Sequence, residues 1–201
     1  MGSLQTLAGI LGMSVVSGIN LYATILTVGL AIRYGWVTGL PQDLQVLANP
    51  VVLTAAGVMY AAEFIADKVP FITPIWDAIH TVIRPLGAGL LALGAAGNLD
   101  PAVQVLAALA GGSIALGAHS TKMGVRLAAH ATPEPVSHSL ISLAEDAGVV
   151  GLLILVWQHP LIAIPVIVAL LGLFAWLLVV VVRGVRSLLR NALGRLRAAF
   201  Q

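Results

Sequence analysis

Apolar residues form long runs along this chain, and short polar stretches separate the runs. The runs occupy residues 4–32, 51–66, 75–96, 101–129, 137–157 and 161–182. About 20 helical residues cross the hydrocarbon core of a bilayer, and continuous apolar runs differ from the alternating pattern of membrane barrel strands. We therefore predict an all-α, polytopic membrane protein with about six transmembrane helices, which would place both termini in the cytoplasm.

The first run leaves two possibilities open. It is long for a single span and contains Ser17, Gly18 and Asn20 near its middle. These residues predict either one tilted helix or a helix that is broken near Gly18. The run at 51–66 is short for a span and ends at Asp67, so the number of spans depends on these two segments.

The composition agrees with a membrane protein and excludes one class of chemistry. Hydrophobic residues make up 59% of the chain, charged residues make up 9%, and the mean hydropathy is +1.01. Soluble domains usually contain about 45–50% apolar residues. The chain has no cysteine, which excludes disulfides, thiolate metal sites and cysteine nucleophiles.

Basic residues are concentrated at the C-terminus. Five of the ten Lys and Arg residues lie within 183–201, which contain no Asp or Glu. This excess predicts a cytoplasmic C-terminus. Arg183, Arg186 and Arg190 share one face at helical spacing, so we expect 183–201 to be a basic amphipathic tail that binds anionic lipids, with no nucleic acid as partner. Residues 1–182 form the predicted transmembrane helical domain.

Polar and ionisable residues recur at helical spacing within several apolar runs. These stripes are Asn20 with Ser17 and Thr24; Glu63 with Asp67; Asp77, His80 and Arg84; His119, Lys122, Arg126 and His130; and His138, Ser142 and Glu145 with the adjacent Asp146. Lipid cannot satisfy such groups, so we expect the stripes to converge on a shared polar site. Two other readings remain open: charges near segment ends can reach the interface, and Arg84, Lys122 and Glu145 can form structural salt bridges.

An internal duplication is a further prediction. Residues 14–20 (SVVSGIN) are similar to residues 113–119 (SIALGAH), which would relate two halves of three spans each as an inverted repeat. A competing register pairs Pro74 with Pro135 and Arg84 with Glu145. Both registers cannot reflect one duplication.

The segments at 66–91 (ADKVP…WDAIHTVIRPLGAGLL) and 111–148 (GGSIALGAHSTKMGVR…ATPEPVSHSLISLAEDAG) carry a family resemblance. With 17–35, they resemble bacterial membrane proteins of the family catalogued as domain of unknown function 4126. The resemblance implies an integral protein of the bacterial inner (cytoplasmic) membrane with this layout. It implies no activity.

The stripes favour a small transporter or channel for an ion or small charged solute, with protons as a candidate coupling ion. The carboxylates Glu63, Asp67, Asp77, Glu145 and Asp146 would bind or exchange cations or protons. The cations Arg84, Lys122 and Arg126 would act as counter-charges, Asn20 would contribute a polar group, and His80, His119 and His138 would couple to protons. We expect a homo-oligomer, such as a dimer, in the bilayer.

Two alternatives belong to other functional classes. Lys122 and Arg126 would suit a lipid phosphate, which predicts a lipid-phosphate binding or translocating protein. Histidines and carboxylates would suit a membrane-embedded metal-dependent enzyme, although no HExxH motif or GxSxG motif is present. We therefore expect no catalytic residue and no cofactor, and whether a metal binds stays open.

Overall fold

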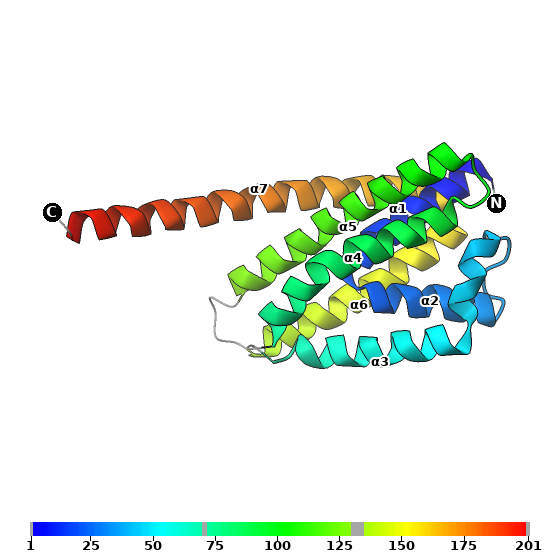
Figure 1. The fold of residues 1–201 in the computed structure, drawn as a ribbon, viewed down its shortest axis with the longest axis horizontal. Helices are drawn as coiled ribbons and strands as arrows, with labels where there is room; N and C mark the ends of the chain where they lie inside the picture. Colours follow the sequence, from blue (N-terminus) through cyan, green and yellow to red (C-terminus); the bar gives the residue numbers. More distant parts are fainter. Residues whose placement is uncertain (1, 70–71, 130–134, 200–201) are drawn as a thin grey trace.

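The computed structural model describes residues 2–69, 72–129 and 135–199, and Figure 1 shows their arrangement. Within these ranges every regular element is a helix, as the apolar runs predict. The elements are α1 (Ser3–Ile19), α2 (Leu21–Arg33), the 3₁₀ helix η1 (Gln42–Ala48), α3 (Pro50–Ala66), α4 (Thr73–Ala95), α5 (Pro101–Ala129), α6 (Pro135–Gln158) and α7 (Pro160–Ala199).

The apolar run at residues 4–32 forms two helices and not one tilted helix, which is one of the two alternatives that the sequence left open. Asn20 separates α1 from α2 and has an extended backbone, with φ −149° and ψ 101°. Its side-chain oxygen accepts a hydrogen bond from the backbone N–H of Ala23, so Asn20 is the N-cap of α2. In Figure 1 the two helices form a hairpin whose open ends lie at the same end of the bundle. We call residues 18–20 the hairpin tip.

Within the described residues, the structure has fewer candidate spans than the six expected. Among the residues that the structure describes, three helices are long and apolar enough to cross a membrane, namely α4, α5 and α7. The pair η1 and α3, bent by 64° at their junction, gives a fourth if it counts as one span. With 17 and 13 residues, α1 and α2 are short for a full span, and together they fold back as the hairpin.

Helix α1 is the centre of the bundle and packs against α4, α5, α6 and α7. Small residues permit this close packing. A Cβ on Gly18 would lie 2.5 Å from the carbonyl oxygen of Ala115, and a Cβ on Gly111 would lie 2.6 Å from the Cβ of Ala92. Such small-residue contacts are typical of helix pairs in membranes. They bring the hairpin tip directly against α5.

The C-terminal residues continue the last helix. Helix α7 runs from Pro160 to Ala199 and extends past the other helices at one end of the bundle, which we call the tail end (Figure 1). The start of α1 lies at the opposite end, whereas six spans would have placed both termini together. The amphipathic role of the tail and the inverted repeat both stay predictions.

Candidate binding site at the hairpin tip

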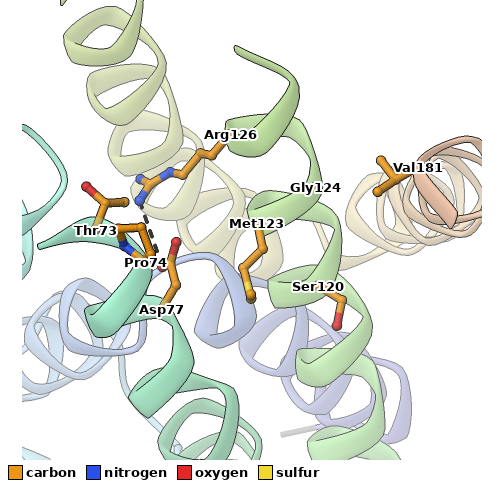
Figure 2. A pocket seen from close by; sticks show the side chains of 8 residues that line it. All are labelled: Thr73, Pro74, Asp77, Ser120, Met123, Gly124, Arg126 and Val181. Atoms are coloured by element: carbon orange, nitrogen blue, oxygen red, sulfur yellow. Dashed lines mark ion pairs between the residues drawn. The ribbon is translucent and has the colours of Figure 1, made fainter. Parts of the chain in front are cut away.

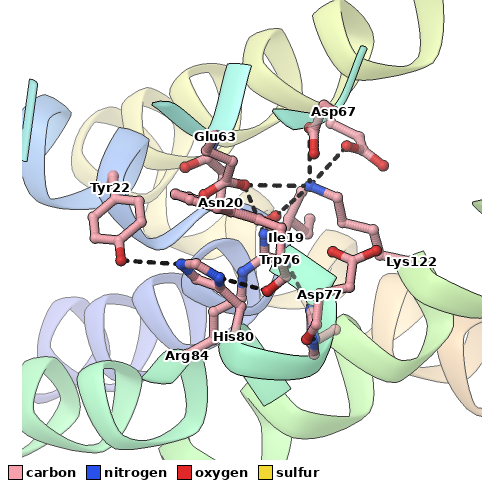
Figure 3. A network of polar contacts seen from close by, with 12 residues as sticks. Ile19, Asn20, Tyr22, Glu63, Asp67, Trp76, Asp77, His80, Arg84 and Lys122 are labelled. Carbon is pink, nitrogen blue, oxygen red and sulfur yellow. Dashed lines mark hydrogen bonds and ion pairs between the residues drawn. The ribbon is translucent and has the colours of Figure 1, made fainter. Parts of the chain in front are cut away.

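Charged side chains from four parts of the fold meet beside the hairpin tip. Figure 2 shows two of them, Asp77 and Arg126, and Figure 3 shows a further group around Lys122. We call the set the charged cluster: Glu63, Asp67, Asp77, Arg84, Lys122, Arg126, Glu145 and Asp146. These residues lie near the end of α3, between the start and the middle of α4, near the end of α5 and in the first half of α6, toward the tail end of the bundle.

The deepest ion pair joins Arg84 to Glu63, and both side chains are fully buried. Arg84 Nη2 donates to Glu63 Oε1 at 2.6 Å, and Arg84 Nη1 lies 2.8 Å from His119 Nδ1. Because a guanidinium only donates, His119 Nδ1 must accept, which places the imidazole proton on Nε2. Nε2 lies 3.1 Å from the carbonyl oxygen of Asp77 and donates to it. The histidine therefore links Arg84 to the backbone of α4.

Two cations hold the hairpin tip through its backbone. Arg84 Nη1 donates to the carbonyl oxygen of Gly18 at 3.1 Å, and Lys122 Nζ donates to that of Ile19 at 2.8 Å. These carbonyls belong to the last turn of α1, where they lack intrahelical partners and carry the negative end of the helix dipole. Asn20 Nδ2 adds a 2.9 Å hydrogen bond to Asp146 Oδ1, so the tip is tied to α4, α5 and α6.

The outer part of the cluster is a network around Asp67 and Glu145. Arg126 donates to both carboxylate oxygens of Asp67, and its Nη2 lies 2.9 Å from Glu145 Oε2. Lys122 Nζ lies 2.9 Å from the same Glu145 oxygen. Burial raises the pKa of the Asp67 carboxyl, but hydrogen bonds from Arg126 and the charge of Lys122 outweigh burial and hold the pKa below its ordinary value of 3.8.

His80 belongs to a separate chain of contacts beside the cluster. Its Nδ1 lies 2.8 Å from the carbonyl oxygen of Trp76 and donates to it, which leaves Nε2 as the acceptor for the Tyr22 hydroxyl at 3.0 Å. Figure 3 shows this chain running from Tyr22 through His80 to Trp76. His80 therefore has two partners within the bundle and no direct contact with the charged cluster among the described hydrogen bonds.

Sequence reasoning missed two tyrosines at this site. Tyr22 contacts His80, and the Tyr60 hydroxyl donates to Asp146 Oδ2 at 2.7 Å. Tyr60 precedes Glu63 by three residues and therefore shares its helical face, a spacing that could have identified it. The side chain of His138 lies outside the described residues, so its expected place in the stripe stays a prediction.

Two cavities reach the charged cluster, one on each side of α5. The first has a volume of about 310 Å³ and lies between α4, α5 and Val181 of α7, with Asp77, Arg126 and Ser120 in its wall (Figure 2). The second has a volume of about 360 Å³ and lies between α5, α6 and α7, with Lys122 and Glu145 in an otherwise mostly apolar wall. Both cavities place a charged group of the cluster beside open space.

The charges of the cluster do not cancel. It contains five carboxylates and three cations, so its formal charge is −2 when all are ionised. Within the part of the chain that the structure describes, no three His, Asp or Glu side chains are arranged to hold a metal ion.

Comparison with known proteins gives one match. The family model described as "Domain of unknown function (DUF4126)" matches residues 7–180. The searches of curated proteins and of solved structures found no match.

Proposed function

Since the chain belongs to the family of domain of unknown function 4126, whose description supplies no activity, we propose a function from the charged cluster itself. The protein is a small membrane transporter or channel for a cation or small cationic solute, with protons as the candidate coupling ion. The observation that carries this proposal is the meeting of eight ionisable side chains, five of them buried and three half-buried, with a net negative charge at the tip of a broken helical hairpin.

The energetics of the bilayer support this function. Charged groups at membrane depth are costly, and where they persist they commonly line substrate or proton pathways. Broken helices in transporters present backbone carbonyls to bound cations, as the tip presents the carbonyls of Gly18 and Ile19 to Arg84 and Lys122. Here internal cations take the place that a transported cation would occupy. A solute cation would enter by competing with these internal partners.

The cellular setting is part of the proposal. Apolar helices long enough to cross a membrane indicate a membrane protein. We place it in the bacterial inner membrane with the C-terminus in the cytoplasm, because the basic residues after 182 follow the positive-inside tendency. In this orientation the tail end, and with it the charged cluster, faces the cytoplasmic half of the bilayer. Anionic lipids would bind the tail, and a homo-oligomer would enclose the path.

The test is ion-driven current on a solid-supported membrane loaded with proteoliposomes. Concentration jumps of H⁺, Na⁺, K⁺ and guanidinium are applied to the wild type and to Glu145→Gln, with Asp100→Asn as the control. Asp100 is an exposed helix cap at the opposite end of the bundle, and asparagine can cap in its place. We expect a current from at least one cation that Glu145→Gln removes and Asp100→Asn retains. No current from any of the four would overturn the proposal.

One observation favours the lipid-phosphate alternative as a second candidate. The cavity between α5, α6 and α7 is lined mostly by apolar side chains, which suits an acyl chain, and Lys122 lies in its wall. Against it, Lys122 and Arg126 each already pair with carboxylates at 2.9 Å or less. Copurified phospholipid that is lost in Lys122→Gln would favour the lipid function. The metal-dependent enzyme has no supporting arrangement among the described residues.

A further inference from the structure

Asp77 differs from the other carboxylates of the charged cluster. Its nearest cation is Arg126 Nη1 at 4.0 Å, and its Oδ1 has no hydrogen-bond partner, although the residue is only 5% exposed. The side chain lines the cavity between α4, α5 and α7, together with Thr73, Ser120 and Arg126 (Figure 2). A buried carboxylate oxygen without a donor is costly unless water or a proton satisfies it.

The other four carboxylates are engaged more closely. Each has a partner within 2.9 Å: Glu63 has Arg84, Asp67 has Arg126, Glu145 has Lys122 and Arg126, and Asp146 has Tyr60 and Asn20. Protonating any of them would disturb a hydrogen bond or ion pair that already exists. Adding a proton to Asp77 Oδ1 would break no hydrogen bond and would weaken only the ion pair with Arg126 at 4.0 Å. Glu63 Oε2 is also buried without a hydrogen-bond partner, but a proton there would remove the charge that pairs with Arg84.

We propose that Asp77 is the carboxylate that takes up and releases the coupling proton, and that the cavity between α4, α5 and α7 is its water access. This inference rests on the proposed transport function and deepens it. A proton from water in the cavity adds to Oδ1, and the formal charge of the cluster rises by one. Release of the same proton to the cavity restores the charge.

A proton suits this position better than a metal cation. A bound metal cation would lie close to the guanidinium of Arg126 and be repelled by it, and it would need several oxygen ligands. A proton forms a neutral carboxylic acid, which can donate a hydrogen bond to water in the cavity. Asp77 and Arg126 are therefore arranged for exchange of protons at a carboxylate, with the guanidinium as its nearby counter-charge.

Other charged groups face Asp77 and will influence its titration. Helix α5 contributes Arg126 and Lys122, and the end of α3 contributes Asp67. On its own helix, Asp77 is close to Arg84, while His119 of α5 donates to its backbone oxygen.

Arg126 connects Asp77 to the rest of the cluster. It bonds Asp67 and Glu145 closely and Asp77 only at 4.0 Å. Loss of the proton from Asp77 would draw Arg126 toward it and weaken its contact with Glu145, which is also the partner of Lys122. Proton exchange at Asp77 would in this way change the environment of the hairpin tip, because Lys122 donates to the carbonyl of Ile19.

The first test measures the carboxyl group directly and does not need transport. Infrared difference spectra of the purified protein, recorded across a pH titration, should contain the carbonyl band of a protonated buried carboxyl group. We expect Asp77→Asn to remove this band and Asp100→Asn to keep it. A band that persists unchanged in folded Asp77→Asn would overturn the assignment. Asp77→Glu is the second variant in case the asparagine variant misfolds: it keeps a carboxyl group, so its band should remain at a shifted frequency.

The second test measures access through the cavity. Because the natural chain has no cysteine, Ser120→Cys introduces a single thiol into the cavity wall. A membrane-impermeant methanethiosulfonate reagent should modify this thiol and shift the infrared band of Asp77, whereas Ala88→Cys, buried between helices, should stay unmodified. Modification of Ser120→Cys without any effect on the band would contradict the access route. If both tests give the expected results and no cation current is found, Asp77 remains the proton-binding group and the proposed transport function is wrong.

Discussion

At the scale of single residues, the pairing of Arg84 with Glu63 is the most deeply buried ion pair of the site. Both side chains are fully buried, and the same guanidinium also binds Gly18 and His119. A buried charge that loses its partner is left without compensation in a medium of low dielectric constant. Both residues therefore have to be substituted together if the effect of losing their charges is to be measured without leaving one buried charge unpaired.

We predict that Glu63→Gln lowers the free energy of unfolding by roughly 3–5 kcal/mol, because Arg84 would remain charged without its partner. Thermal unfolding in detergent, followed by intrinsic fluorescence, measures the change. The double variant Glu63→Gln/Arg84→Gln should recover part of the loss, since it leaves no uncompensated charge. Equal melting of the wild type and Glu63→Gln would contradict this account of the pair.

Acid should weaken the protein partly through Asp67. The folded state holds the pKa of Asp67 below 3.8, so the ionised carboxylate stabilises the fold above that pH, and the contribution disappears as the pH falls through the lower folded value. We predict that melting temperatures of the wild type fall below pH 3.8 and that Asp67→Asn flattens this part of the curve. The same fall in melting temperature below pH 3.8 in both proteins would show that Asp67 does not contribute to acid destabilisation.

The charged residues could be identified from the sequence, but their individual partners could not. Helical spacing placed Asp77, His80 and Arg84 on one face, and the structure separates them by role: Arg84 in the deepest pair, His80 with Tyr22, and Asp77 at a cavity. Which partner each of these side chains contacts depends on the orientation of the helix faces toward one another, which spacing within one helix does not give. The tyrosines were missed because only ionisable and strongly polar residues were followed along the helical faces, although Tyr60 lies one turn before Glu63.

At the scale of elements, the hairpin of α1 and α2 positions the site. Its tip approaches α5 so closely that Gly18 has no room for a side chain. The carbonyls that bind Arg84 and Lys122 are free only because α1 ends there. The break and the charged cluster therefore depend on each other.

We predict that Gly18→Ala destabilises the protein by about 1–3 kcal/mol, because its Cβ would lie 2.5 Å from the carbonyl oxygen of Ala115. Gly117→Ala is the matched control on α5, since a Cβ there meets nothing within 4 Å. It should be neutral or slightly stabilising. Melting temperatures that fall equally in the two variants would argue against a specific role for the close approach.

Element boundaries were predictable where proline marks a helix start. Pro101 begins α5, and Pro50 begins α3 directly after the capping Asn49. The break at Asn20 was only one of two alternatives, because asparagine can cap a helix or lie within one. The helix η1 was missed, since its seven residues carry no strong periodic pattern.

At the scale of the whole molecule, the charged cluster occupies one half of the bundle. The half near the start of α1 is apolar, with Ala8 near the start of α1 and Leu153 near the end of α6 in the buried core. The charged half lies at the tail end, where α7 extends beyond the other helices (Figure 1). Hydropathy identified the apolar runs but predicted more spans than the three or four found among the described residues. Part of the difference is the folding back of α1 and α2, which depends on packing that hydropathy does not record.

The orientation can be measured with single cysteines in the natural cysteine-free chain. We predict that a membrane-impermeant maleimide labels Leu99→Cys in intact cells and labels Ser187→Cys only after the membrane is opened, because the basic tail faces the cytoplasm. The two positions lie at opposite ends of the bundle, so each is a control for the other. The reverse labelling pattern would place the charged cluster in the outer half of the bilayer.

The most direct test of the central claim, that the charged cluster is a transport site, is the rate of proton movement into sealed proteoliposomes. A pH-sensitive dye inside the vesicles reports the rate for the wild type, Asp77→Asn and Asp100→Asn at matched protein density. The account predicts that the wild type and Asp100→Asn acidify the lumen well above empty vesicles and that Asp77→Asn does not. Acidification by the wild type no faster than in empty vesicles, or equally fast in Asp77→Asn, would contradict it.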